Sequence, residues 1–211
     1  LRAGVECYHS LKKELKSDGL LGGVGDEGGF APNLPANEAG LGYMVRAIEG
    51  AGYSTEEIGI ALDVASTEFY KGGAYHMDGK QLSGEDLSDI YASWVDEYPL
   101  LSIEDGFAED DWRSWSHCMR DIGQKVQLVG DDLFVTQSGR LSMGIESQAA
   151  NAILVKVNQV GTVTETLETT PWFLWRSRLS FALGVRIRGF RFVWFFFGAF
   201  FFRLCHAAAN L

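Results

Sequence analysis

Four ionisable residues stand at the ends of successive apolar runs. The runs are residues 58–63 (IGIALD), 100–104 (LLSIE), 126–131 (VQLVGD) and 152–156 (AILVK), which end in Asp63, Glu104, Asp131 and Lys156. A charge often marks only the point where an apolar strand reaches water, and for any one of these residues that interpretation is the better one. Three acids followed by a lysine at consecutive runs instead predict one shared site, because the carboxyl ends of barrel strands converge.

Converging carboxylates repel one another unless a cation lies among them. The oxygen ligands of Asp63, Glu104 and Asp131 favour Mg²⁺, and the four histidines are too scattered to form a competing metal site. Beside a divalent cation the charged form of a lysine is disfavoured, so Lys156 is a candidate base. A base beside Mg²⁺ suits removal of a proton next to a carboxylate, because the metal neutralises the enolate as it forms.

A further acidic candidate lies in a glycine-rich segment. Residues 24–30 (VGDEGGF) place Asp26 and Glu27 between glycines. Glycines allow the backbone to approach a ligand closely or to turn tightly. A solvated acidic turn fits this pattern as well as a functional loop does, so the pattern alone leaves Glu27 undecided.

Helical patterns alternate with the apolar runs. Apolar spacing predicts helices over or around residues 1–17, 41–48, 87–94, 112–115 and 139–147, and glycines predict a hairpin within 69–77. Ser83 and Asp86 form a capping-box signal before the third of these helices. Apolar strands alternating with helices indicate an α/β fold with a parallel sheet covered on both faces. We expect a partial (β/α) TIM-type barrel, incomplete at both ends, since a full barrel needs about 250 residues.

The overall composition is that of an acidic globular chain. Its 211 residues include 18 Lys and Arg against 28 Asp and Glu, a net charge of −10, which argues against nucleic acid as a partner. Hydrophobic residues make up 46%, which argues against intrinsic disorder. Cys7, Cys118 and Cys205 form neither a disulfide framework nor a metal-ligand spacing, so a reducing, intracellular compartment fits them best.

The composition changes abruptly near Pro171. Residues 171–211 contain no Asp, Glu or Lys but hold six Arg and ten of the 14 Phe. We therefore expect a barrel domain over residues 1–170 and an aberrant aromatic and Arg-rich tail over 171–211 that is not native to the fold. The apolar run 192–202 (FVWFFFGAFFF) is too short for a membrane-spanning helix, which needs about 20 residues. A segment that lies at the membrane interface remains an alternative. Translation in a wrong frame, or through an unspliced segment, would produce such a tail, and we favour this origin over membrane binding.

Five segments resemble the enolase (phosphopyruvate hydratase) family in order and spacing. They are VGDEGGFAPN, ALDVASTEFY, YPLLSIEDGFAEDDW, QLVGDDLFVT and ILVKVNQVGTVTETL, within residues 1–168. The segments SIEDG and LVGDDLFVT are more similar to those of bacterial members of the family than to those of eukaryotic members. The resemblance implies the family's C-terminal barrel domain, a cytoplasmic homo-oligomer and Mg²⁺-dependent dehydration of 2-phosphoglycerate to phosphoenolpyruvate in glycolysis.

The resemblance also implies roles for single residues. Lys156 would take the C2 proton of 2-phosphoglycerate, and Glu27 would protonate the departing C3 hydroxyl. The metal ligands would be Asp63, Glu104 and Asp131, with Lys156, Glu104 and Asp131 also contacting substrate and Asp132 only a neighbour. No membrane is implied for the barrel part.

Some family features are not found in this sequence. It has no match to the family's His loop and Gln–Glu pair, nor to the downstream SHRSGETED stretch and second lysine that hold phosphate and carboxylate. It also begins at Leu1 inside a predicted helix, so we expect an internal fragment that is inactive alone.

Two alternatives remain open. One is another acid-sugar dehydratase or racemase of the same superfamily, although those relatives carry an early Lys-x-Lys base and lack the DEGG loop. The other is a non-catalytic or membrane-associated product in which the aromatic tail is the working part.

Overall fold

The computed structural model describes residues 1–25, 28–176, 180–181 and 202–203. Its helices are α1 (Arg2–Ser17), α2 (Asn37–Gly50), α3 (Gly84–Glu97), α4 (Trp112–Ile122), α5 (Ser138–Ser147), α6 (Val157–Val160), α7 (Val163–Arg176) and the short 3-10 helix η1 (Ser66–Phe69). Its strands are β1 (Gly23–Val24), β2 (Phe30–Ala31), β3 (Ile60–Asp63), β4 (Tyr70–Lys71), β5 (Ala74–Met77), β6 (Lys80–Leu82), β7 (Leu100–Glu104), β8 (Gln127–Gly130), β9 (Ala152–Ile153), β10 (Ser180–Phe181) and β11 (Phe202–Arg203).

The central element is a parallel sheet with the strand order β10-β9-β8-β7-β3-β11. Its middle strands are the predicted apolar runs, and every residue of β8 is buried. Strands buried on both faces are typical of parallel sheets covered by helices. Within the described part of the chain this sheet does not close, so the predicted α/β fold with a partial barrel is confirmed.

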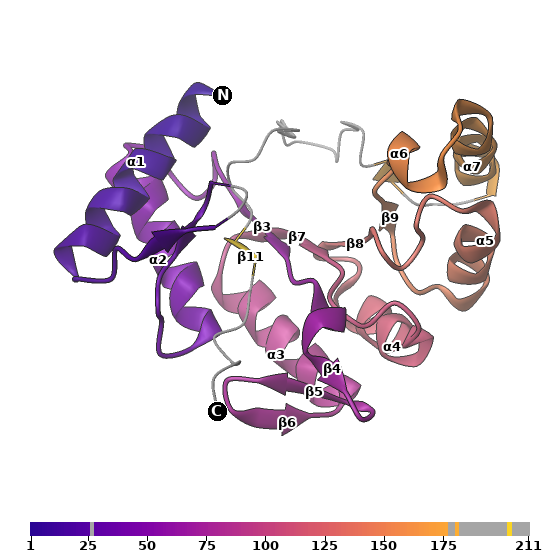
Figure 1. The fold of residues 1–211 in the computed structure, drawn as a ribbon, viewed down its shortest axis with the longest axis horizontal. Helices are drawn as coiled ribbons and strands as arrows, with labels where there is room; N and C mark the ends of the chain where they lie inside the picture. Colours follow the sequence, from indigo (N-terminus) through magenta and orange to yellow (C-terminus); the bar gives the residue numbers. More distant parts are fainter. Residues whose placement is uncertain (26–27, 177–179, 182–201, 204–211) are drawn as a thin grey trace.

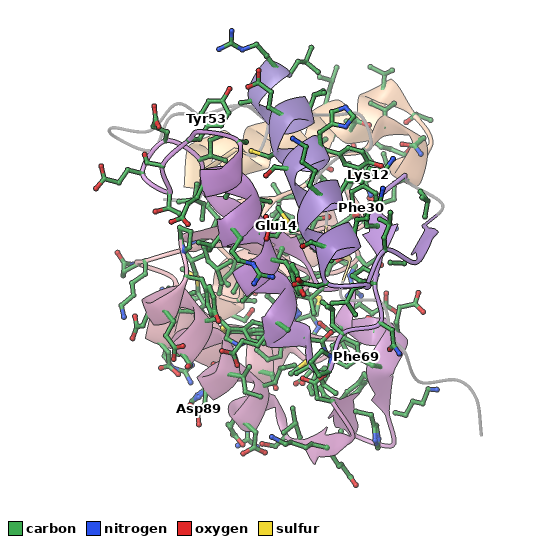
Figure 2. All side chains as sticks on the ribbon, turned by 90° about the vertical axis from the view of Figure 1, so that its left-hand side faces the viewer. Lys12, Glu14, Phe30, Tyr53, Phe69 and Asp89 are labelled. Atoms are coloured by element: carbon green, nitrogen blue, oxygen red, sulfur yellow. The ribbon has the colours of Figure 1, made fainter. Side chains whose placement is uncertain are left out.

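Helices pack in pairs beside the sheet (Figure 1). The helix α1 lies along α2, α3 lies along α4, and α5 lies along α7. Figure 2 shows α1 and α2 side by side, with Phe30 of β2 next to α1. The apolar stripes predicted for the first two helices are buried at Leu11, Leu15 and Ile48, but Val5 near the start of the first helix is exposed.

The third helix begins as the sequence predicts. The Ser83 hydroxyl accepts the Asp86 backbone N–H at 3.1 Å, and the Asp86 carboxylate accepts the Ser83 backbone N–H at 2.8 Å. This reciprocal pair is a complete capping box, which satisfies donors that a helix N-terminus otherwise leaves unpaired. The helix then buries Leu87, Tyr91 and Trp94 against the core.

The predicted hairpin is part of a larger antiparallel sheet, β4-β5-β6. Gly72 and Gly73 form its first turn with φ of +62° and +83°, which glycine adopts without a steric penalty. The third strand was not predicted from the sequence. Its neighbour β5 contributes Tyr75, which is fully buried and whose hydroxyl donates to Asp111 at 2.7 Å.

An aromatic cluster fills the core behind the carboxyl end of β7. The ring of Phe107 meets Tyr75, Tyr91 and Trp115 edge-on at centroid distances of 5.9, 5.6 and 5.9 Å. Edge-to-face contacts of this kind are favourable for aromatic pairs. They fix the loop that follows β7, and this loop continues directly from Glu104.

The predicted domain boundary at residue 170 lies inside α7, which continues to Arg176. Beyond it, β10 pairs with β9 and β11 pairs with β3, each through two residues. The rest of residues 177–211, including most of the apolar run, lies outside the described residues, so the separate tail remains a prediction. Among the described helices, none is long and apolar enough to cross a membrane.

Candidate functional site

The parallel strands deliver the predicted residues to one edge of the sheet. Asp63 at the end of β3 is the register partner of Glu104 at the end of β7. Glu104 in turn pairs with Val129 of β8, two residues before Asp131. Lys156 follows β9, whose Ile153 pairs with Gly130. Parallel register therefore places all four residues at the carboxyl ends of neighbouring strands, as the sequence pattern indicates.

Glu104 is the most deeply buried of these residues, with 4% of its surface exposed. Burial, together with the negative charges of Asp63, Asp105 and Asp131, raises its carboxyl pKa to about 9, although the charge of Lys156 acts in the opposite direction. Its Oε2 atom is buried and has no hydrogen-bond partner within the described part of the chain. A buried carboxylate oxygen without a donor, facing other acids, is suited to a cation.

The carboxylate of Asp131 is engaged on both of its oxygens. Its Oδ1 accepts a hydrogen bond from Nε2 of Gln159 at 3.0 Å, and its Oδ2 forms an ion pair with Nζ of Lys156. The Asp131 side chain is 10% exposed and that of Lys156 is 34% exposed. One predicted metal ligand and the predicted base are thus in direct contact.

The acids around Lys156 favour its charged form. Burial alone lowers its pKa, but the hydrogen bond and charge of Asp131, together with Glu104 and Asp132, outweigh burial and raise the pKa above its ordinary value. The predicted loss of the charged form concerns a lysine beside a bound divalent cation, so it stays a prediction. A cation that offset the negative charge of these acids would remove this support for the ammonium form.

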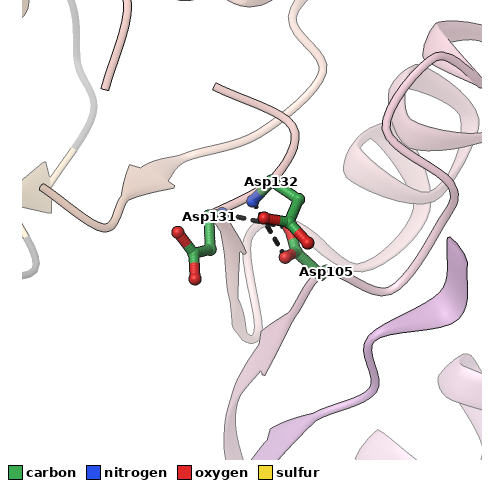
Figure 3. Close-up of side chains that lie close together, drawn as sticks. All are labelled: Asp105, Asp131 and Asp132. Carbon is green, nitrogen blue, oxygen red and sulfur yellow. Dashed lines mark hydrogen bonds between the residues drawn. The ribbon is translucent and has the colours of Figure 1, made fainter. Parts of the chain in front are cut away.

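A second set of carboxylates lies at the turn after β8 (Figure 3). One carboxylate oxygen each from Asp105, Asp131 and Asp132 lie within 4.8 Å of one another. This set shares only Asp131 with the predicted ligands Asp63, Glu104 and Asp131, which stay a prediction. Both sets consist of the hard oxygen donors that Mg²⁺ prefers, and the partnerless oxygen of Glu104 independently fits a cation at this edge.

Asp105 was not predicted from the sequence. Its Oδ1 accepts the backbone N–H of Asp131 and its Oδ2 accepts that of Asp132, each at 3.0 Å. Burial raises the pKa of Asp105 to about 7, although the two backbone hydrogen bonds favour the ionised form. The only sequence signal was its place before Gly106, which indicates a turn and no particular partner.

Thr136 and Gln159 were also missed. The Thr136 hydroxyl accepts the backbone N–H of Lys156 at 2.9 Å and donates to Oε1 of Gln159 at 3.1 Å. Gln159 in turn donates to Asp131, so these residues connect the loop after β8 with the segment that carries Lys156. A threonine in a turn and a glutamine in the short helix α6 carry no distinctive sequence signal.

Glu27, the predicted proton donor, lies outside the described residues. The segment around it contains a short antiparallel pair that the sequence did not predict, with Gly23 opposite Ala31 and Val24 opposite Phe30. The ring of Phe30 stacks on Tyr8 of α1 at 4.4 Å between centroids. The role of Glu27 therefore remains a prediction.

Comparison with known proteins places this site in a family context. The family described as the enolase C-terminal TIM barrel domain matches residues 1–173. The enolase of Beutenbergia cavernae is 53% identical over 169 residues, which cover 80% of this chain and 40% of that protein. The enolase of Bdellovibrio bacteriovorus is 54% identical over 169 residues, with the same coverage of each chain. The chain spans about 40% of the length of these relatives.

Proposed function

Because this chain belongs to the enolase family, we propose that its strand-end site serves the Mg²⁺-dependent dehydration of 2-phosphoglycerate to phosphoenolpyruvate. The observation that carries the proposal is the buried Oε2 of Glu104, which has no hydrogen-bond partner among the described residues, beside Asp63 and the Asp131–Lys156 pair. This arrangement combines a place for a cation with an amine that can move a proton.

Asp63, Glu104 and Asp131 would hold the metal. Bound there, Mg²⁺ supplies positive charge against the negative charge that develops on the substrate when its C2 proton leaves. Lys156 takes that proton at Nζ, which requires that its own proton has left first. A cation held by Asp131 would offset the negative charge that keeps Lys156 protonated, so metal binding would favour Lys156 as a base.

The remaining role is that of the acid. Glu27 would donate a proton to the C3 hydroxyl, which then leaves as water. Its support is the match of VGDEGGF to the family pattern and the position of this segment between β1 and β2. Two groups with opposite proton-transfer tasks are the arrangement that a dehydration needs.

A chimera tests whether these residues perform the chemistry. The aligned 169 residues of this chain would replace the matching segment of the Bdellovibrio bacteriovorus enolase. We expect phosphoenolpyruvate formation, and exchange of the C2 hydrogen of 2-phosphoglycerate in heavy water that Lys156→Ala abolishes while Mg²⁺ still binds. Lys125→Ala is the matched control, because Lys125 lies on the surface and pairs with Asp96. A chimera that exchanges C2 hydrogen equally well with Lys156→Ala contradicts the proposal.

The chain by itself is proposed to bind Mg²⁺ and to turn substrate over negligibly. Residues 171–211 contain no segment resembling the family's phosphate clamp. Orientation of a substrate can contribute about 7–11 kcal/mol to lowering a barrier, so an unclamped substrate reacts slowly. The check is an assay of phosphoenolpyruvate formation by the purified chain at saturating Mg²⁺, in which turnover at the rate of an intact family enolase would be contradictory.

A further inference from the structure

The turn after β8 is held by a side chain from the neighbouring strand. Asp105 follows β7, and its two carboxylate oxygens accept the backbone N–H groups of Asp131 and Asp132 (Figure 3). We propose that Asp105 is a positioning residue that fixes this turn and thereby aims the Asp131 carboxylate. The inference rests on the proposed function to the extent that Asp131 is taken as a metal ligand.

The contact needs a carboxylate. Two consecutive N–H groups each find one oxygen of the same side chain, at 3.0 Å in both cases. Asp105 is only 7% exposed, so water cannot readily replace it, and a buried N–H left without an acceptor is costly. An amide offers one oxygen and one donor group, and the donor would oppose the second N–H.

Asp105 is itself firmly held. Its backbone N–H donates to the Val129 carbonyl at 3.0 Å, and its carbonyl accepts the Ser66 backbone N–H at 3.1 Å. The carbonyl of the next residue, Gly106, accepts the buried hydroxyl of Tyr91 at 2.8 Å. These contacts come from β8, η1 and α3, so the carboxylate is presented from a rigid position.

The same geometry separates Asp105 from the residues available to a ligand. Both of its oxygens are occupied by backbone donors, whereas those of Asp131 contact two side chains, Gln159 and Lys156. Asp131 and Asp132 leave the turn in different directions (Figure 3). Within the three-carboxylate cluster, Asp105 therefore supports the turn and Asp131 is presented by it.

The test uses two substitutions that retain the backbone of Asp105. Its φ is +44°, a conformation that asparagine and glycine tolerate, so Asp105→Asn and Asp105→Gly are the appropriate variants of the purified chain. Amide hydrogen exchange would be measured by NMR at Asp131, Asp132 and, as a reference, Val64, whose N–H donates to the Glu104 carbonyl. Mg²⁺ affinity would be measured by calorimetry.

The matched control is Asp110→Asn. It removes the same charge from the same loop, but the Asp110 side chain is 77% exposed and pairs with Arg140. We expect both Asp105 variants to speed exchange at Asp131 and Asp132 about tenfold or more, without a change at Val64. Mg²⁺ affinity should fall about 10- to 100-fold, the usual effect of losing a group that orients a ligand, and Asp110→Asn should change neither quantity.

Other results overturn the proposal. Unchanged exchange at the two amides would show that Asp105 does not hold the turn, and equally faster exchange at Val64 would indicate a general loss of stability. Unchanged Mg²⁺ affinity despite faster exchange, or an equal loss in Asp110→Asn, would remove the positioning role. If the unaltered chain binds no Mg²⁺, the proposed function fails, while the amide exchange still decides whether Asp105 holds the turn.

Discussion

At the scale of the residue, the site consists of buried acids whose negative charges destabilise the fold when no cation offsets them. Glu104 has one oxygen without a donor in a buried position, and its pKa is raised to about 9. Asp131 instead satisfies its charge through Lys156 and Gln159. The cost of burying a negative charge is therefore avoided in two ways: Glu104 retains a proton, and Asp131 pairs with Lys156.

This difference leads to a prediction for Glu104→Gln. The substitution should lower Mg²⁺ affinity by at least about tenfold, because it removes a charged ligand, and it should not destabilise the metal-free chain. At neutral pH the metal-free Glu104 is already neutral, so an amide of similar shape costs little. Calorimetry with Mg²⁺ and thermal unfolding in a chelator are the measurements. A marked drop in the melting temperature without Mg²⁺ would contradict this account.

At the scale of the element, the start of α3 offers a pH-dependent test. Hydrogen bonds from the Ser83 side chain and backbone lower the pKa of Asp86 below its ordinary value of 3.8. A lowered folded-state pKa stabilises the fold above the ordinary pKa, and this contribution disappears as the pH falls through the folded-state pKa. The capping box should therefore weaken only in acid.

The variant Ser83→Ala should lower the free energy of unfolding by about 1 kcal/mol at pH 7. Its difference from the unaltered chain should shrink as the pH falls below about 4, because protonated Asp86 no longer accepts both hydrogen bonds. Urea unfolding of both chains at a series of pH values measures this difference. An undiminished difference in acid would mean that Asp86 takes no part in the cap.

A glycine-to-alanine substitution should have opposite effects on stability at two positions within helices. A Cβ on Gly144 in α5 would lie 2.3 Å from the ring of buried Phe134, whereas a Cβ on Gly42 in α2 would meet nothing within 4 Å. Gly144→Ala should therefore lower the free energy of unfolding, by about 1–3 kcal/mol less the gain in helix propensity. Gly42→Ala should raise it by up to about 1 kcal/mol. Denaturant unfolding decides, and stabilisation by both substitutions would refute the packing argument.

At the scale of the whole molecule, the described structure is an open parallel sheet with its helices beside it. The predicted division at residue 170 rests on composition, since residues 171–211 lack Asp, Glu and Lys altogether. An aromatic run such as 192–202 favours association when it is exposed.

Deleting residues 171–211 should consequently raise the soluble yield and leave Mg²⁺ affinity unchanged. The deletion removes the end of α7 together with β10 and β11, but each of these strands pairs with the sheet through only two residues and neither carries a predicted ligand. Soluble yield, calorimetry and liposome sedimentation of both chains are the measurements. A liposome affinity that the deletion abolished would identify the segment as a membrane anchor instead.

The sequence by itself determined the central strands β3, β7, β8 and β9, the helices α1 to α5 and the convergence of Asp63, Glu104, Asp131 and Lys156. Those features follow from local periodicity and from the rule that parallel strands share one carboxyl edge. The capping box of Ser83 and Asp86 was predictable for the same reason, because its partners are three residues apart.

Only the tertiary structure decided which groups hold that site in place. Asp105 contacts backbone groups 26 and 27 residues away, and Gln159 reaches Asp131 across 28 residues. No periodic pattern encodes contacts over such separations, since they depend on strand register and on the turns between elements. The raised pKa of Lys156 belongs to the same class, because it results from charges that only folding brings together.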